Sequence, residues 1–244
     1  MGGIILGGVG AVLAAPIALG AGVLLAAGAV GYAGVKAFPE KLVDPKQIVG
    51  NRLSSIGELE KLSDSIPRVG IVGSSSSGKS TLVEKLMQSA NAPEPTADVY
   101  IAILRSGGAN PKIFALIDGA GEEYPQQFSV AEAADLLFIV LDHNEGDSDA
   151  TIKKTRLDDH RSFIKQLTAF LKGKSFADQF VILLNKNDNW GRSANASDFE
   201  SWGQEVKADL SEVVQGTRIF VRGHSNWDVD CVNQFWTEAE EKTQ

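Results

Sequence analysis

Short apolar runs recur along the chain, and most of them contain few polar residues. Continuous apolar runs are typical of strands that are buried on both faces. They predict strands at Val69–Val72, Val99–Leu104, Lys112–Ile117, Leu136–Leu141, Phe180–Leu184 and Arg218–Val221. Between these runs, helical spacing of apolar residues predicts helices at Thr81–Met87, Asp159–Leu171, Ser197–Val214 and Asp228–Lys242. Strands that alternate with helices predict an α/β fold with a doubly wound, mostly parallel sheet.

The N-terminal segment, residues 1–35, has a different pattern. From Gly2 to Val35 there is no charged residue and no His, Asn or Gln. This run exceeds the roughly 20 apolar residues that a membrane-spanning helix needs. Pro16 divides it, so the segment predicts either one transmembrane helix, about Ala11–Gly34, or a tight hairpin that turns near Pro16. Its length favours the single helix, and the absence of a basic residue before it disfavours a cleaved signal peptide.

Residues 36–67 are predicted to form a helical tether. Basic residues soon after the apolar run place the C-terminal side in the cytoplasm. Asp44 and Pro45 resemble the start of a helix. Apolar residues then recur at helical spacing, at Val49, Leu53, Ile56, Leu59 and Leu62. Such a helix either packs on the globular domain, which we favour, or rests on the membrane surface.

The charge and cysteine content restrict the class of protein. The formal net charge of the 244 residues is −8, and all charged side chains lie after residue 35. An acidic domain argues against nucleic acid as the main partner. The single cysteine, Cys231, excludes an internal disulfide and fits a reducing compartment. We therefore expect a membrane protein whose third segment, residues 68–244, is a globular domain in the cytoplasm.

The strongest motif lies between the first strand of this domain and the helix that follows. Residues 73–80 read Gly-Ser-Ser-Ser-Ser-Gly-Lys-Ser, a phosphate-binding loop in its expected setting. Glycines let successive N–H groups point at phosphate oxygens, and the helix N-terminus adds attraction for an anion. Lys79 is expected to reach the β- and γ-phosphates and Ser80 to ligate Mg²⁺. The residues expected to bind the phosphates are Gly73, Ser74, Ser75, Ser76, Ser77, Gly78, Lys79, Ser80 and Thr81.

A second motif follows the strand Lys112–Ile117. Asp118 ends this apolar run and begins an Asp-x-x-Gly pattern that reaches Gly121. A carboxylate presented in this way beside a phosphate loop organises Mg²⁺. The Gly121 N–H is expected to contact the γ-phosphate and to sense its loss on hydrolysis.

A third motif predicts the identity of the base. Asn185-Lys186-Asn187-Asp188 follows the strand Phe180–Leu184. The Asp188 carboxylate can accept hydrogen bonds from the ring N–H and the exocyclic amine of guanine. Adenine has no donor at these positions and would leave the carboxylate unsatisfied, so the motif favours GTP and GDP over ATP. Lys186 can lie along the base, and Asn185 can brace the phosphate loop.

With these three motifs, residues 68–240 resemble a Ras-like small GTPase of the translation-factor-related class. The resemblance implies a P-loop NTPase fold and a threonine that closes over Mg²⁺ in the triphosphate state. Thr96 is the candidate for that threonine, and the Mg²⁺ ligands would be Ser80, Thr96 and Asp118. The family's last motif falls at Arg222–Ser225, where it matches poorly. Backbone N–H groups of Gly223 and His224 are the candidates to meet the guanine oxygen.

Two departures from the family pattern affect hydrolysis. Many Ras-like proteins place a glutamine directly after Asp-x-x-Gly, whereas this chain has Glu122. A carboxylate near the γ-phosphate is electrostatically unfavourable, so we predict slow intrinsic hydrolysis. The expected catalytic residues are Lys79, Thr96, Gly121 and Glu122. Ser75 and Ser76 stand where Ras proteins have glycines, and they crowd the path of an activating arginine from another protein.

The favoured function is a membrane-anchored, Mg²⁺-dependent GTP switch that exposes its switch loops to a protein effector. An apolar N-terminal segment followed by a Ras-like domain is similar in architecture to the β-subunit of the signal-recognition-particle receptor. Two alternatives remain: a membrane-remodelling or immunity-type GTPase, and a nucleotide-binding scaffold with little turnover. An ATP-using P-loop protein is disfavoured because the chain lacks a Leu-Ser-Gly-Gly-Gln-type signature.

Overall fold

The computed structural model describes residues 42–87, 99–106, 111–119, 124–146 and 148–242. They belong to one compact unit, residues 40–244. The predicted transmembrane segment lies outside the described residues, as do Thr96, Gly121 and Glu122. Within the described ranges, no helix has both the length and the apolar character that crossing a bilayer requires.

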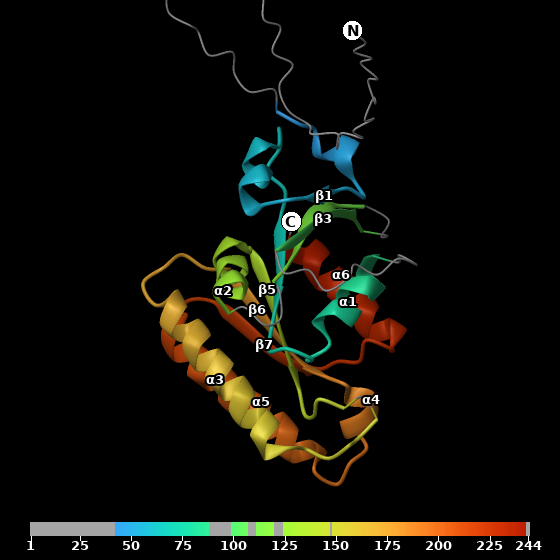
Figure 1. Ribbon diagram of the computed structural model, residues 1–244, viewed down its shortest axis with the longest axis vertical. Coiled ribbons are helices and arrows are strands. Elements are labelled where there is room, and N and C mark those ends of the chain that lie inside the picture. Colours follow the sequence, from blue (N-terminus) through green and yellow to red (C-terminus); the bar gives the residue numbers. More distant parts are fainter. Residues whose placement is uncertain (1–41, 88–98, 107–110, 120–123, 147, 243–244) are drawn as a thin grey trace, which may run out of the picture. The chain divides into compact units, whose positions relative to one another are not determined.

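A seven-stranded sheet forms the centre of the unit (Figure 1). Its strands are β1 (Arg52–Leu53), β2 (Arg68–Val72), β3 (Tyr100–Arg105), β4 (Ile113–Asp118), β5 (Leu136–Asp142), β6 (Gln179–Asn185) and β7 (Arg218–Gly223). Their spatial order is β1-β3-β4-β2-β5-β6-β7. β4, β2, β5, β6 and β7 run parallel, and β3 pairs antiparallel with both β1 and β4. The mostly parallel α/β sheet is confirmed, and six of its strands lie within two residues of the predicted runs.

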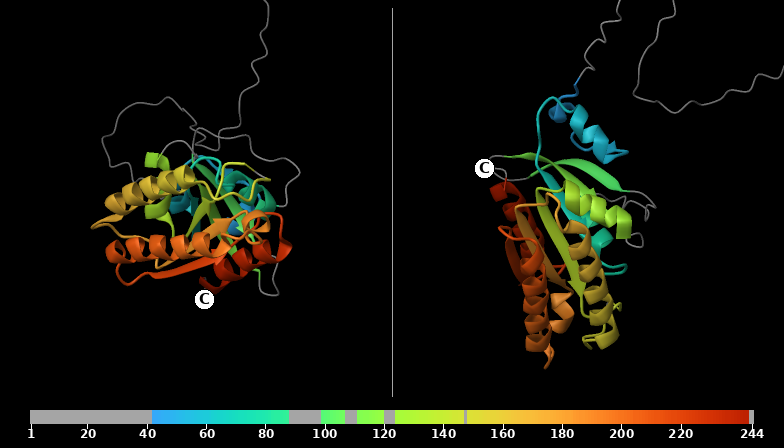
Figure 2. Two further views of the ribbon diagram at one scale, coloured as in Figure 1. Left: turned by 90° about the horizontal axis from the view of Figure 1, so that it is seen from below. Right: turned by 90° about the vertical axis from the view of Figure 1, so that its left-hand side faces the viewer.

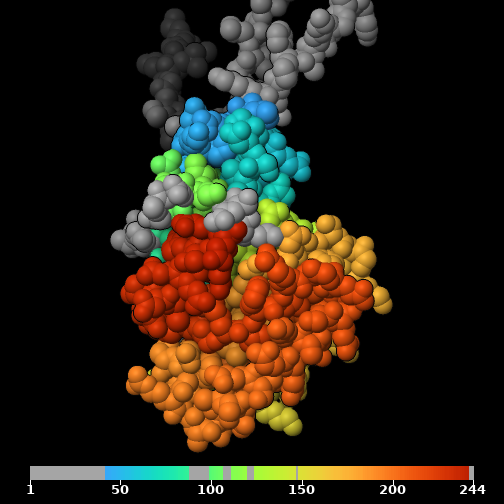
Figure 3. Space-filling model, turned by 180° about the vertical axis from the view of Figure 1, so that it is seen from behind, coloured from blue at the N-terminus to red at the C-terminus, as the bar shows by residue number. Residues whose placement is uncertain are grey.

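Helices cover both faces of the sheet (Figures 1 and 2). One face carries α2 (Tyr124–Ala133), α3 (Lys154–Leu171) and α5 (Ala196–Val213), and the other carries α1 (Lys79–Met87) and α6 (Val229–Lys242). The short helix α4 (Asn187–Trp190) follows β6 directly. In Figure 3, α6 in red lies on the surface beside the orange α5.

Each face of β5 belongs to a separate core. Leu137, Ile139 and Leu141 join the cluster that includes Phe163 of α3 and Trp202 of α5. Phe138 faces the opposite way and stacks on Phe235 of α6, with 4.1 Å between ring centroids. Burial on both faces explains why this strand has no polar position before Asp142, and it fixes the carboxyl end of the strand rigidly.

The prediction of a continuous helix between Asp44 and Leu62 is wrong. Asp44 does cap a helix that begins with Pro45, because its carboxylate accepts a hydrogen bond from Lys46 N–H at 2.9 Å. This helix, Pro45–Ile48, is however a 3₁₀ helix of four residues. Gly50, at φ +86°, then turns the chain toward β3, where its N–H donates to Ile103 O at 2.7 Å. A second 3₁₀ helix, Ile56–Lys61, follows β1. Leu59 and Leu62 are nevertheless buried, so the segment packs on the globular unit as we favoured.

Candidate functional site

The loop after β2 holds its shape through two glycines. Gly73 has φ +152° and Gly78 has φ +95°, a region that side chains rarely adopt. A Cβ at Gly73 would collide with Val140 O, and one at Gly78 would collide with the Asn185 side chain. The Gly73 N–H also donates to Gln127 Oε1 of α2 at 2.7 Å. Ser74 and Ser77 are buried beneath the loop, whereas Ser75 and Ser76 form its exposed tip.

Lys79 begins α1 and points back under the loop. Its Nζ donates to Gly73 O at 2.6 Å and to Ser74 O at 2.8 Å, and the residue is only 5% exposed. Burial lowers the pKa of Lys79 to about 8, although the charge of Asp118 acts against this shift. A polyphosphate beside this ammonium would favour its charged form. The lysine is therefore placed where negative charge from a ligand is needed.

Asp118 ends β4 beside the phosphate loop, because β4 pairs with β2 and Asp118 stands opposite Ile71. Its Oδ1 is buried with no hydrogen-bond partner among the described residues. Burial raises the pKa of Asp118 to about 7, against the charge of Lys79. Ser80 lies exposed in the first turn of α1. A carboxylate oxygen without a partner and a hydroxyl are both hard oxygen ligands, so the side chains of Asp118 and Ser80 fit Mg²⁺.

Asn185 is the last residue of β6, and Lys186 and Asp188 follow it. Asn185 Nδ2 donates to Ser77 O at 2.9 Å, which braces the loop. Lys186 takes the left-handed backbone conformation, with φ 62°, and Asp188 lies in α4. A hollow here is lined by Gly78, Thr81, Asn185, Lys186, Asp188, Asn189, Asn226 and Trp227. The phosphate loop and the Asn-Lys-x-Asp motif thus share one pocket.

His224 acts in a different way from the one expected. Its N–H donates to Leu184 O at 2.9 Å and so is not available to a guanine oxygen. Its ring bonds Asn226 Oδ1 at 3.0 Å, and Asn226 Nδ2 donates to Gly78 O at 2.8 Å. Gly223, the last residue of β7, lies against Asn187. His224 therefore orients Asn226 against the phosphate loop.

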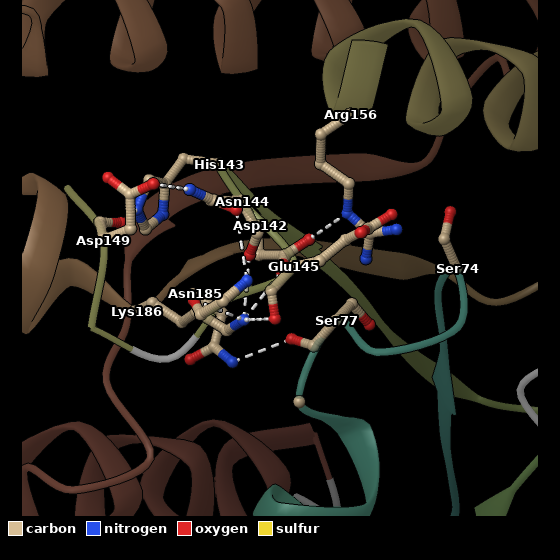
Figure 4. A network of polar contacts seen from close by, with 12 residues as sticks. Ser74, Ser77, Asp142, His143, Asn144, Glu145, Asp149, Arg156, Asn185 and Lys186 are labelled. Atoms are coloured by element: carbon tan, nitrogen blue, oxygen red, sulfur yellow. Dashed lines mark hydrogen bonds and ion pairs between the residues drawn. The ribbon is translucent and has the colours of Figure 1, made fainter. Parts of the chain in front are cut away.

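A buried polar cluster contacts the phosphate loop, and Figure 4 shows two of its residues, Asp142 and Arg156. Asp142, Arg156 and His160 make up this cluster, and none of the three sequence motifs includes them. Arg156 Nη2 donates to Ser75 O at 2.6 Å, and the Ser74 hydroxyl lies 3.0 Å from His160 Nδ1. Asp142 ends an apolar strand just as Asp118 does, so the same reasoning would have found it.

Comparison with known proteins agrees with this geometry. Residues 68–186 match the family model described as 50S ribosome-binding GTPase. The matched residues run from the start of β2 to Lys186 of the Asn-Lys-x-Asp motif. No curated protein matches the chain.

The solved structures that are similar to it include two bound to GTP analogues. One is the Arl6 BBS3 small GTPase from Trypanosoma brucei with bound GppNp, which has a TM-score of 0.53 and 18% sequence identity. The alignment covers 72% of this chain and 96% of the Arl6 chain. The other is translation elongation factor SelB from Methanococcus maripaludis in complex with GppNHp, which has a TM-score of 0.47 and 18% sequence identity. That alignment covers 73% of this chain and 35% of the SelB chain. The first likeness shows the fold.

The raised pKa of Asp118 predicts a pH dependence for the ligand-free protein. The folded state keeps the Asp118 proton up to about pH 7, whereas the unfolded state loses it near 3.8. The folded state therefore binds more protons in this window, and Asp118 makes the protein less stable as pH rises through it. Asp118→Asn is expected to remove this contribution.

The measurement is urea unfolding of both proteins at pH 5 and pH 7. Burial lowers the pKa of His224 to about 4, so this histidine makes the protein more stable as pH rises through the same range. The test is therefore the difference between the two proteins, in which the His224 contribution cancels. The free energy of unfolding of Asp118→Asn should exceed that of the wild type by more at pH 7 than at pH 5. An equal difference at both pH values would contradict the raised pKa of Asp118.

Proposed function

We propose that this chain binds GTP and GDP with Mg²⁺, hydrolyses GTP slowly and acts as a nucleotide-dependent switch. The observation that carries the proposal is the Asn185–Ser77 hydrogen bond, which holds the Asn-Lys-x-Asp motif against the phosphate loop. A nucleotide lying in this pocket would place its phosphates on the loop and its base beside Asp188. The Asp188 carboxylate accepts two hydrogen bonds from guanine and none from adenine.

The chain's own residues supply binding and orientation. Lys79 and the loop N–H groups hold the β- and γ-phosphates, and Asp118 and Ser80 hold Mg²⁺. The metal, when bound, neutralises charge that develops between the β- and γ-phosphates. Thr96 and Gly121 are proposed to order around the γ-phosphate and to be released after hydrolysis. Glu122, in the place of a water-orienting glutamine, is the reason for the slow rate.

We also propose that residues 2–35 anchor the protein in a membrane, with the GTPase domain in the cytoplasm and an effector on the switch loops. This part rests on the sequence, namely the uncharged apolar run and the basic residues that follow it. Expression with a fluorescent tag followed by carbonate extraction tests it. The full chain should stay in the pellet, and a chain lacking residues 2–35 should be extracted.

Phosphate release tests the enzymatic proposal. The purified full chain, with Mg²⁺, should release phosphate from GTP at a slow but measurable rate and leave ATP intact. Lys79→Met is the matched control for contaminating hydrolases, because it should release none. GTP binding without any turnover, even with membranes and lysate added, would contradict the enzyme and support a scaffold.

Trp227 offers a direct signal of nucleotide binding. It lines the pocket, is 70% exposed and lies 4.3 Å from Lys85 Nζ, measured to the ring centroid. A purine in the pocket is expected to change its contact with solvent and therefore to shift its fluorescence on GDP addition. Trp227→Phe should abolish most of the change while keeping GDP affinity within about threefold, because a phenyl ring keeps an aromatic face there. Trp190 and Trp202 are 1% and 4% exposed, and Trp236 packs on Phe114 with 5.1 Å between ring centroids. None of these three lines the pocket, so a full-size change in the variant would contradict this placement.

A further inference from the structure

Asp142 lies at the centre of the buried cluster and is completely inaccessible to solvent. It is the last residue of β5 and stands opposite Asn185, the last residue of β6. Its Oδ1 accepts from Arg156 Nε at 2.7 Å and lies 2.8 Å from His160 Nε2. Its Oδ2 pairs with Lys186 Nζ at 3.0 Å (Figure 4). One carboxylate therefore holds three side chains.

Two of these side chains lead to the phosphate loop. Arg156 uses Nε for Asp142 and Nη2 for Ser75 O, so a single guanidinium bridges the carboxylate and the tip of the loop. Burial lowers the pKa of His160, which is therefore neutral at pH 7. The Ser74 hydroxyl lies 3.0 Å from Nδ1, and Nε2 lies 2.8 Å from Asp142 Oδ1 and 3.1 Å from Asp142 N. Both contacts fix the backbone of the loop that would carry the phosphates.

The third side chain leads to the base. Lys186 Nζ lies 3.0 Å from Asp142 Oδ2 and also donates to Asn144 O at 2.9 Å and to Glu145 O at 3.2 Å. These contacts anchor the Asn-Lys-x-Asp motif at a residue whose left-handed backbone depends on its surroundings. Asp188 follows two residues later, so the position of Lys186 bears directly on the position of the base-reading carboxylate.

The charges of the cluster suit an anionic ligand. Burial alone would raise the pKa of Asp142, but His160, Arg156 and Lys186 together lower it, so the carboxylate is ionised. With His160 neutral, Asp142, Arg156 and Lys186 leave one net positive charge behind the phosphate loop. Buried ion pairs seldom stabilise a fold more than apolar residues of the same size would. The cluster is therefore better explained by what it connects.

We propose that Asp142 is a positioning residue that couples the phosphate loop to the base-reading motif. Through Arg156 it sets the loop at Ser75, and through Lys186 it sets the element that carries Asp188. A change at the phosphate end is thereby transmitted to base recognition. This proposal rests on the guanine-nucleotide function proposed above and adds a residue that determines its specificity indirectly.

The test substitutes a residue that contacts the phosphate loop and measures how well the protein recognises the base. Inosine triphosphate (ITP) has the guanine ring N–H but lacks the exocyclic amine, so the ratio of GTP to ITP affinity reports how well Asp188 is placed. Arg156→Gln in the full chain is expected to lower this ratio roughly 5- to 10-fold, in the range of coupling between connected residues. A purely structural role would lower both affinities equally and leave the ratio unchanged.

Arg161→Gln is the matched control, because Arg161 lies on the same helix but forms a surface pair with Glu205 at 2.6 Å. It should leave the ratio and the unfolding midpoint as in the wild type. Asp142→Asn should lower the ratio as Arg156→Gln does, and the double variant should lower it no further. If Arg156→Gln fails to fold, Arg156→Lys is used instead. It keeps the charge, but its single ammonium does not reproduce both the Asp142 and the Ser75 contacts, so the ratio should still fall.

Two results would overturn the proposal. A folded Arg156 variant with an unchanged GTP to ITP ratio would show that the two ends are independent. Additive losses in the double variant would show that Asp142 does not connect them. A wild-type protein that binds GTP and ITP equally would contradict the guanine assignment itself and the coupling with it, so the two failures are distinguishable.

Discussion

Replacing Lys79 by methionine is expected to weaken GTP binding by at least about 100-fold. The ammonium would form charge-assisted hydrogen bonds to phosphate oxygens, and such bonds contribute about 1.5–3 kcal/mol each. The ligand-free protein should not lose stability, because burial already lowers the pKa of Lys79 to about 8 and its charged form is costly there. Titration with a fluorescent GTP analogue, together with thermal unfolding, checks both parts.

Lys165→Met is the control for this experiment, since Lys165 is exposed on α3. It should bind GTP like the wild type. The assignment of the phosphate loop is contradicted if Lys79→Met binds GTP within about threefold of the wild type while remaining folded.

Replacing Asp188 by asparagine is expected to reverse the preference for the base. GTP affinity should fall by at least about 100-fold, because the guanine donors then face an amide and lose their shared acceptor. Xanthine has a carbonyl where guanine has the exocyclic amine, so the new amide donor should improve the affinity for xanthosine triphosphate. Asp188→Ala should lose the affinity for GTP without this gain.

Competition among GTP, xanthosine triphosphate and ATP on the same protein gives the result directly. Asp198→Asn, an exposed position in the first turn of α5, is the control and should keep the wild-type order. If Asp188→Asn still prefers GTP over xanthosine triphosphate, Asp188 does not read the base.

The strands could be predicted because burial on both faces leaves a nearly pure apolar run, as in Leu136–Asp142. The three motifs could be placed at one edge because the carboxyl ends of parallel strands meet there. Helix α2 was missed because its buried face includes Gln127, a polar residue that is 0% exposed and accepts from Gly73 N–H. Such a residue hides the apolar spacing that marks a helix.

The other features that the sequence did not predict depend on contacts between distant parts of the chain. The segment after Asp44 has helical spacing, yet Gly50 pairs with Ile103 and draws it to the sheet edge. Arg156 belongs to the site because Ser75 O, 81 residues earlier, accepts its hydrogen bond. No local pattern distinguishes this arginine from Arg161, which lies five positions later on the surface.

Calorimetric titration of the purified full chain with GTP and with ATP, each with Mg²⁺, tests the central claim most directly. We expect GTP to bind at least about 1,000-fold more tightly, because adenine would leave the Asp188 carboxylate without a donor. Equal affinities, or tighter binding of ATP, would contradict it.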